Sequence, residues 1–493
     1  MMDVRNVAPI ALRGSVMFEA RTPTPRGLSN ELELRPSRGI VVRVLDRDGR
    51  ALVQTRTTPD GRFEVQAPGN AALVEVRAQT AEDEVTVTRD AQGAQIHAVR
   101  VPASASEITI VARDHEGSFA GALHLLDTMH RGIETVRAWS GRALPPVYAY
   151  WDRGVTREWS YYRGERPEGS GRFCVELLGG DPGAQATSDT DEHDEAIVLH
   201  ELGHFVMDRL TGDSSVGGQH PRGALIDPGL AWEEGRATWF ATAVLGAPAY
   251  RDTIGLAPHG RMRVDESLET PMGPRGMGSE TSVAGVLWDL ADGDGTLPDD
   301  DADGIALGAA PLLQAMIEIA RVDGAFPSLP TFLRYLVASG RVPESGVRTM
   351  LARTGEPPSV LPEGDIAPWP LDLRAGEAAQ GKIDGLTQPA PSGGANRPDT
   401  GFDAIRAYRV RVERRSMLSV RLVIRGSGGD ADRTDLDLEL RDARARVLDA
   451  ARGRASSEAV GRVVEPGWYV VYVRDGGRGN RADYELHVTT SPR

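Results

Sequence analysis

A single pentapeptide, His200-Glu201-Leu202-Gly203-His204, constrains this 493-residue chain more than any other stretch. Acidic residues precede it and apolar residues recur through it at helical spacing, so we expect a helix from about 191 to about 211. Residues four apart on a helix share a face, with Cβ atoms about 6 Å apart, so both imidazoles can bind one tetrahedral zinc ion. Glu201 lies one residue round, where a general base that takes a proton from water belongs.

Two ordinary histidines on a buried helix are the alternative, and a third ligand would decide between the two interpretations. The candidates are Glu233 and Glu234, in a second stretch, 230–241, where apolar residues also recur at helical spacing. His193 lies two turns before the first motif histidine on the same face and is a competing ligand. At a charged helix start, however, such a histidine is more often simply exposed.

The two stretches together resemble the gluzincin metallopeptidases, the group that contains thermolysin and the membrane-alanyl-type aminopeptidases. In that group the H-E-x-x-H helix is followed by a second helix with the pattern E-G-x-A, which Glu234-Gly235-Arg236-Ala237 matches. The resemblance implies a zinc site formed by His200, His204 and Glu234. It further implies that Glu201 is the catalytic base and that the surrounding core is mainly helical and thermolysin-like.

Two features depart from the pattern of that group. The fourth position after the ligand glutamate, often an acidic partner in thermolysin-like enzymes, is Thr238 here. No downstream His or Tyr declares itself as the group that stabilises the oxyanion, and Tyr250 and His259 are the nearest candidates. Asp289 lies in 278–290, which resembles uncharacterised bacterial gluzincins; it could accept the second N–H of a ligand histidine or could be a solvated residue near a helix end.

Composition limits the partners that this chain can have. The net charge of −15 and the pI near 5.3 argue against nucleic acid and anionic membrane surfaces, since both require a basic face. No long apolar run is present, so we expect no membrane-spanning helix. Cys174 is the only cysteine, which excludes an intramolecular disulfide and a cysteine-based zinc site. Residues 1–12 lack the apolar core of a signal peptide, so either the protein stays inside the cell or a signal lies upstream of this numbering.

Residues 14–112 are predicted to form a β-sandwich, because short alternating strands are broken by Asp-Gly turns. The stretch Thr58-Pro59-Asp60-Gly61-Arg62-Phe63 carries a resemblance to the transthyretin-like or carboxypeptidase-regulatory-like sandwiches, which often precede secreted peptidase domains. A generic immunoglobulin-like spacer is the alternative.

The periodicity changes near residue 113, and residues 113–355 are predicted to be the metallopeptidase domain. The strand expected at 173–178, just ahead of the motif helix, is either a wall of the substrate cleft or an ordinary sheet strand. An acidic loop at 289–303 could hold Ca²⁺ through carboxylate and carbonyl oxygens, but it lacks the spacing of an EF-hand, and a solvated loop is the alternative.

Residues 356–376 are predicted to be a linker, and β character returns at 377–490. There, Asp435-Leu436-Asp437-Leu438-Glu439-Leu440 alternates strictly, which predicts leucines that face a core and acids that face water. Together with later strands, this stretch resembles the bacterial pre-peptidase C-terminal domain, a β-sandwich appended to secreted peptidases. The expected fold class is therefore multidomain α+β, a mainly helical thermolysin-like core flanked by two all-β sandwiches.

The sequence thus predicts a zinc metallopeptidase that acts on protein or peptide substrates, and the resemblance implies secretion or a place in the cell envelope. A cell-surface binding or adhesion protein with a vestigial peptidase-like core is the main alternative. A metal hydrolase of a non-peptide substrate is a third possibility, since the same chemistry permits it. The intact ligand set and Glu201 favour an enzyme, because decay usually removes the base or a ligand first.

Overall fold

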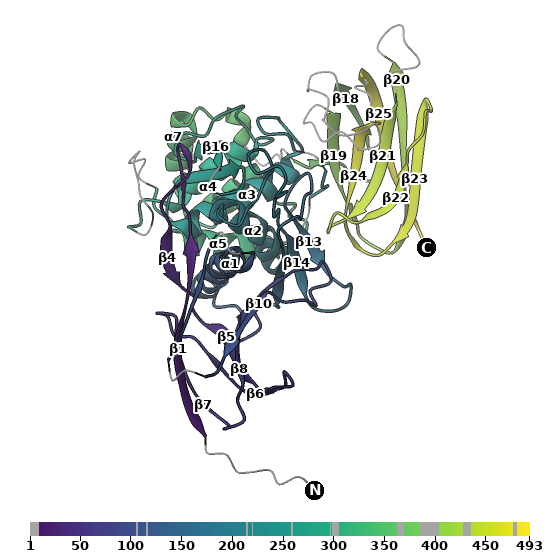
Figure 1. Ribbon diagram of the computed structural model, residues 1–493. Helices are drawn as coiled ribbons and strands as arrows, with labels where there is room; N and C mark the ends of the chain where they lie inside the picture. Colours follow the sequence, from purple (N-terminus) through teal and green to yellow (C-terminus); the bar gives the residue numbers. More distant parts are fainter. Residues whose placement is uncertain are drawn as a thin grey trace. The chain divides into compact units, whose positions relative to one another are not determined.

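The structure is a computed structural model (Figure 1). It describes residues 9–104, 107–114, 117–212, 215–218, 220–257, 260–295, 297, 305–361, 369–384, 404–426, 435–476 and 481–493. The chain forms two compact units: unit 1 comprises Met1–Val206, Phe240–Leu245 and Ala249–Glu266, and unit 2 comprises Met207–Trp239, Gly246–Pro248 and Ser267–Arg493. Two helices, α2 (Glu195–Thr211) and α3 (Pro228–Leu245), contribute residues to both units.

The first sheet of unit 1 is built on the long strand β1 (Ile10–Ala20). This strand pairs antiparallel with β4 (Glu33–Pro36) and β7 (Arg62–Ala67), and parallel with β11 (Glu107–Ala112). The expected alternation is present, because Phe63, Val65 and Ala67 of β7 are buried while the residues between them are exposed. Two short strands, β2 (Pro23–Thr24) and β3 (Gly27–Leu28), form a separate pair.

The second sheet of unit 1 joins strands from both sides of residue 113. Its strand order is β13-β14-β12-β9-β8-β5-β6, with β10 also paired to β8. The strands are β5 (Ile40–Leu45), β6 (Ala51–Arg56), β8 (Leu73–Thr80), β9 (Val85–Thr88), β10 (Ala98–Pro102), β12 (Val147–Tyr150), β13 (Tyr161–Glu165) and β14 (Phe173–Glu176). Parallel pairing of β9 with β12 links the N-terminal strands to those that precede α2. Helix α1 (Phe119–Ser140) contacts β1, β8 and β9.

The prediction of a mainly helical thermolysin-like core is wrong. Among the residues that the structure describes, strand residues outnumber helical ones, 37 to 24 per cent, and they form several sheets. The region between 113 and 355 also contains a two-stranded sheet of β15 (Ala249–Ile254) and β16 (Arg261–Ser267). Helical periodicity is visible within a single segment, whereas a strand reveals its partners only after distant segments have folded together. The sequence therefore overstated the helices.

Four further helices belong to unit 2: α4 (Glu280–Ala291), α5 (Ala309–Ile319), α6 (Leu329–Ala338) and α7 (Glu344–Arg353). Apolar residues that recur at helical spacing predict helices at 311–321, 330–339 and 346–353, and the structure confirms them as α5, α6 and α7. A short 3₁₀ turn, η1 (Pro358–Val360), follows them. Within the described residues, no helix is long and apolar enough to cross a membrane, as the sequence predicts.

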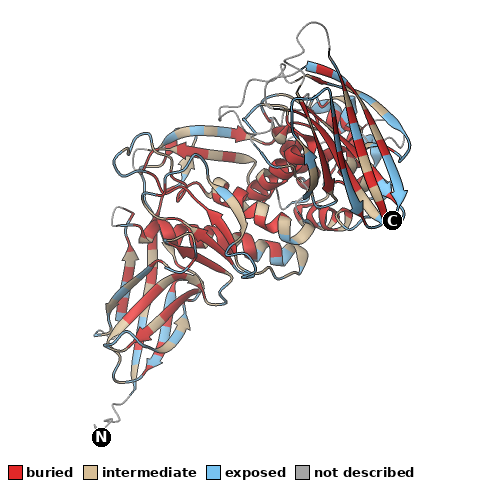
Figure 2. Ribbon diagram, turned by 90° about the vertical axis from the view of Figure 1, so that its right-hand side faces the viewer, coloured by how far each residue is buried: buried red, intermediate tan, exposed pale blue. Residues whose placement is uncertain are grey.

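The C-terminal part of unit 2 is a β-sandwich, as expected. A five-stranded sheet has the order β17-β19-β24-β21-β22, and a four-stranded sheet the order β18-β25-β20-β23. The strands are β17 (Leu371–Asp372), β18 (Ala378–Asp384), β19 (Ile405–Val412), β20 (Ser416–Gly426), β21 (Leu436–Asp442), β22 (Val447–Ala451), β23 (Ser457–Val464), β24 (Gly467–Asp475) and β25 (Arg481–Pro492). Buried residues alternate with exposed or half-buried ones along parts of β23 and β25, whereas most of β24 is buried; buried residues are red and exposed ones pale blue in Figure 2. One cluster of buried apolar side chains fills the space that they enclose.

In the alternating stretch of β21, the prediction is confirmed for the leucines but not for all of the acids. Leu436, Leu438 and Leu440 are completely buried in the sandwich core. The expectation that the acids face water is wrong for Glu439, which is 1% exposed. Its carboxylate accepts hydrogen bonds from Arg441 at 2.7 and 2.9 Å, so an ion pair that the sequence did not reveal accounts for its burial.

Candidate metal centre

The predicted motif helix is confirmed as α2, Glu195–Thr211, and it carries both histidines of the pentapeptide. The Nε2 atoms of His200 and His204 lie 3.1 Å apart, and the two rings are nearly perpendicular, at 88°. When two nitrogens bind the same tetrahedral zinc ion, each at about 2 Å from it, they lie about this far from one another. The ring of Tyr250, an expected oxyanion candidate, packs edge-on against His200, with 5.9 Å between ring centroids. The other candidate, His259, lies outside the described residues.

Glu201 is 8% exposed, and its orientation is set by a neighbouring strand. The backbone N–H of Tyr162, in β13, donates a hydrogen bond to Glu201 Oε2 at 2.9 Å. Strand β13 is at the edge of its sheet, next to β14. The strand predicted at 173–178 as a possible cleft wall is β14, which lies between β12 and β13 and so is an ordinary interior strand. The strand that contacts the base candidate is β13.

The two glutamates of α3 have different partners. Glu233 accepts a hydrogen bond from Arg236 Nε at 2.8 Å, within the same helix. Glu234 Oε1 lies 3.5 Å from Nε2 of His220. Each of His200, His204 and Glu234 offers one ligand atom such that all three atoms lie within 4.8 Å of one another. Two imidazole nitrogens and one carboxylate oxygen are donors that zinc accepts, so this set fits the ion.

His220 is a residue that sequence reasoning missed. It lies outside the helices, in the segment between α2 and α3, and it is 39% exposed. Its other ring nitrogen, Nδ1, lies 3.3 Å from Oε2 of Glu280, the first residue of α4. No periodicity or motif spacing marks a histidine in such a segment, so only its residue type could have drawn attention to it.

The structure tests the prediction for Asp289 but not the prediction of a calcium loop. Asp289 is 2% exposed, so the alternative in which it is solvated is wrong. The predicted calcium loop stays a prediction, because most of its acids, Asp299, Asp300, Asp301 and Asp303, lie outside the described residues. A second group of carboxylates with oxygens within 4.8 Å of one another lies elsewhere, in unit 1, and consists of Asp189, Asp191 and Asp252.

Two buried acids, Asp191 and Asp194, lie just before the start of α2. The carboxylate of Asp194 accepts hydrogen bonds from Thr253 N at 3.1 Å and Thr253 Oγ1 at 3.0 Å, which ties the helix start to β15. Burial, with a further contribution from neighbouring carboxylates such as Asp252, raises the pKa of both Asp191 and Asp194 well above the usual value. Burial therefore favours the protonated form of these two carboxyls.

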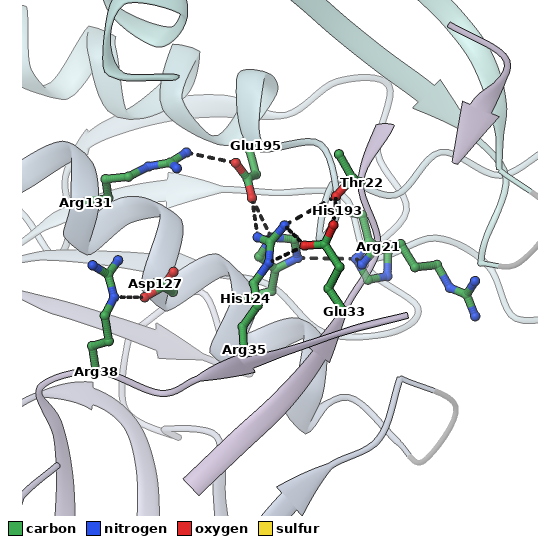
Figure 3. A network of polar contacts seen from close by, with 10 residues as sticks. All are labelled: Arg21, Thr22, Glu33, Arg35, Arg38, His124, Asp127, Arg131, His193 and Glu195. Carbon is green, nitrogen blue, oxygen red and sulfur yellow. Dashed lines mark hydrogen bonds and ion pairs between the residues drawn. The ribbon is translucent and has the colours of Figure 1, made fainter. Parts of the chain in front are cut away.

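Glu195, the first residue of α2, is held by two other elements (Figure 3). It accepts hydrogen bonds from Arg35 of β4 at 2.6 Å and from Arg131 of α1 at 2.8 Å, and its Oε1 lies 3.0 Å from His124 Nε2. Burial acts to raise the pKa of Glu195, but His124 and the two arginines lower it well below the usual value. An ionised Glu195 therefore fixes the helix start to the N-terminal strands and to α1.

His193 belongs to the same network and not to the two-histidine group (Figure 3). Its Nε2 lies 3.0 Å from Asp114 Oδ1, and its Nδ1 lies 3.3 Å from His124 Nδ1. Arg21 donates to the same aspartate at 2.8 Å. His193 is 2% exposed, so the expectation of an exposed histidine at the helix start is wrong, and its contact with the Asp114 carboxylate explains why it can be buried.

Comparisons with known proteins match parts of the chain. A family model described as the Mycolysin C-terminal domain matches residues 155–312, which include α2 and α3. No curated protein matches the chain. Among solved structures, the chain is similar to the pre-peptidase C-terminal domain of collagenase from Bacillus anthracis, with 13% identity, 24% of this chain and 92% of that chain covered, and a TM-score of 0.18. It is also similar to a periplasmic inhibitor of g-type lysozyme from Aeromonas hydrophila, with 14% identity, 24% and 99% of the two chains covered, and a TM-score of 0.15. Scores this low do not establish a shared fold.

Proposed function

We propose that this protein is a zinc-dependent peptidase whose ion is held by His200, His204 and Glu234, a ligand set of the gluzincin type. The observation that carries the proposal is that one ligand atom from each of these residues lies within 4.8 Å of the other two. The family match over residues 155–312 adds support, because domains of that family occur in metallopeptidases. The same match supports the proposal that the protein acts outside the cell, since such domains are typical of secreted proteins.

A zinc ion held by His200, His204 and Glu234 would supply a Lewis acid for the scissile carbonyl and would lower the pKa of water to about 7. Glu201 takes the proton of the attacking water and returns it to the leaving amine. The N–H of Tyr162 keeps the Glu201 carboxylate in place through its hydrogen bond to Oε2. The burial of Glu201 limits competing water around this carboxylate.

The substitution Glu201→Gln tests the role of the base. It preserves the size of the side chain and the acceptor for the Tyr162 N–H, but it removes the group that takes the proton. We expect the variant to bind zinc as the wild type does and to hydrolyse unfolded casein about 10²–10⁴-fold more slowly. Zinc content and casein hydrolysis measured on the same preparations would check this, and wild-type turnover by the variant would remove Glu201 from the reaction.

A further inference from the structure

His220 lies between two carboxylates from different helices of unit 2. Its Nε2 is 3.5 Å from Glu234 Oε1 on α3, and its Nδ1 is 3.3 Å from Glu280 Oε2 on α4. Both carboxylates are more buried than the imidazole, with side chains 9% and 18% exposed against 39%. The histidine thus faces a carboxylate with each of its ring nitrogens, and one of these carboxylates belongs to the proposed zinc site.

The position of Glu280 beside this histidine is fixed by close packing of α3 against α4. Gly235 follows the proposed ligand directly, and a Cβ added there would lie 2.4 Å from Val283 Cβ and 2.9 Å from Glu280 O. Only glycine allows α4 to approach α3 so closely at this point. The start of α4 is also capped, because Ser279 Oγ accepts a hydrogen bond from Ser282 N at 3.3 Å. The backbone of Glu280 is therefore held close to α3, with its side chain beside the imidazole.

We propose that His220 is a positioning residue that holds the Glu234 carboxylate in the orientation from which it binds zinc. The proposal rests on the proposed function, because it requires Glu234 to be a ligand. A carboxylate that binds a metal is usually oriented by an outer partner, and loss of such a partner typically weakens metal binding 10–100-fold. Glu280 Oε2 lies 3.3 Å from Nδ1 on the opposite side of the ring, and this contact keeps Nε2 directed at Glu234.

The alternative is that His220 forms only an ordinary surface ion pair, and this alternative predicts a different result. Exposed pairs contribute little to stability, and their loss has no specific effect on a metal site. The chain offers a matched case in His487, on β25 of the C-terminal sandwich, which is 43% exposed and has Nε2 3.2 Å from Glu485 Oε1. If His220 formed only such an ion pair, His220→Ala and His487→Ala would have the same small effect on zinc affinity.

Zinc affinity of the full-length protein, measured by competition with a chromogenic chelator, tests the proposal. We expect His220→Ala to bind zinc about 10–100-fold more weakly than the wild type. We expect His220→Gln to recover most of the affinity, because its side-chain amide can occupy the same place between the two carboxylates and can donate an N–H to Glu234. His487→Ala should bind zinc as the wild type does, and all four metal-free proteins should unfold at the same temperature.

The outcomes separate the two proposals. Wild-type affinity in His220→Ala, or an equal loss of affinity in His220→Ala and His220→Gln, would overturn the positioning role of His220. A loss that is accompanied by a lower unfolding temperature of metal-free His220→Ala would also overturn it, because the segment itself would then have been damaged. A wild-type protein that binds no zinc at all would instead refute the proposed function.

Discussion

Asp227 shows how one buried carboxyl makes stability depend on pH. It caps α3, since Oδ1 accepts a hydrogen bond from Leu230 N at 2.9 Å, while Oδ2 has no hydrogen-bond partner among the described residues. Burial raises the pKa of Asp227 to about 6. Unfolded aspartate has a pKa near 3.9, so between these values the folded protein binds more protons than the unfolded one, and stability falls as the pH rises through this window.

The substitution Asp227→Asn should remove this dependence, because asparagine caps a helix about as well and does not titrate. From a pKa shift of about two units, we expect the wild type to lose up to about 3 kcal/mol relative to the variant between pH 4 and pH 8. Urea unfolding of both proteins across this range is the measurement. Parallel pH profiles would show that Asp227 does not titrate as its burial implies.

At the scale of residues, the sequence predicted those functional residues that lie at a fixed spacing from one another. His200, Glu201 and His204 could be identified because a helix places residues four apart on one face. Glu234 came from a resemblance to a short pattern, and it remains part of a proposal. His220 could not be found, because its relation to Glu234 depends on how the segment before α3 folds and not on any spacing within it.

At the scale of elements, the anchoring of α2 by the N-terminal strands leads to a prediction for Arg35. This side chain is 25% exposed and pairs with Glu195 at 2.6 Å and with Glu33 at 2.7 Å. Arg13 pairs with Glu64 in the same N-terminal region, at 2.9 Å, but both of those side chains are more than half exposed. The two arginines form a matched comparison of a partly buried and an exposed ion pair.

We expect Arg35→Ala to lower the free energy of unfolding by about 1–3 kcal/mol, because Glu195 loses a charge-assisted hydrogen bond in a buried network. Arg13→Ala should cost no more than about 1 kcal/mol, and less at high salt. Urea unfolding at low and high salt would compare the two variants. Equal losses would mean that the network at the start of α2 contributes no more than a surface ion pair.

The elements that could not be predicted correctly from the sequence are strands whose pairing partners are far away in the chain. The helices α2, α5, α6 and α7 could be predicted because each carries its own apolar stripe. The pairing of β9 with β12 joins residues 85–88 to residues 147–150, and nothing within either short segment indicates the other. The edge position of β13 was missed for the same reason, although it places Tyr162 against Glu201.

On the scale of the whole molecule, the C-terminal sandwich is packed into unit 2. Trp369, Ile405, Ala407, Val470 and Tyr472 form one buried apolar cluster with Phe326, which precedes α6. Arg409 of β19 also donates to the carbonyl of Gly324 at 2.9 Å, and its guanidinium lies 5.1 Å from the centroid of the Trp468 ring. The predicted sandwich thus has a defined place against the helical part of its own unit.

The zinc content and peptidase activity of the intact protein test the central claim most directly. Purified protein should be analysed for zinc and assayed on unfolded casein before chelation, after chelation and after zinc is restored. The account predicts one zinc ion per chain, loss of hydrolysis with the ion, and recovery of both together. Protein that contains no stoichiometric zinc, or that hydrolyses casein equally well after the ion has been removed, would contradict it.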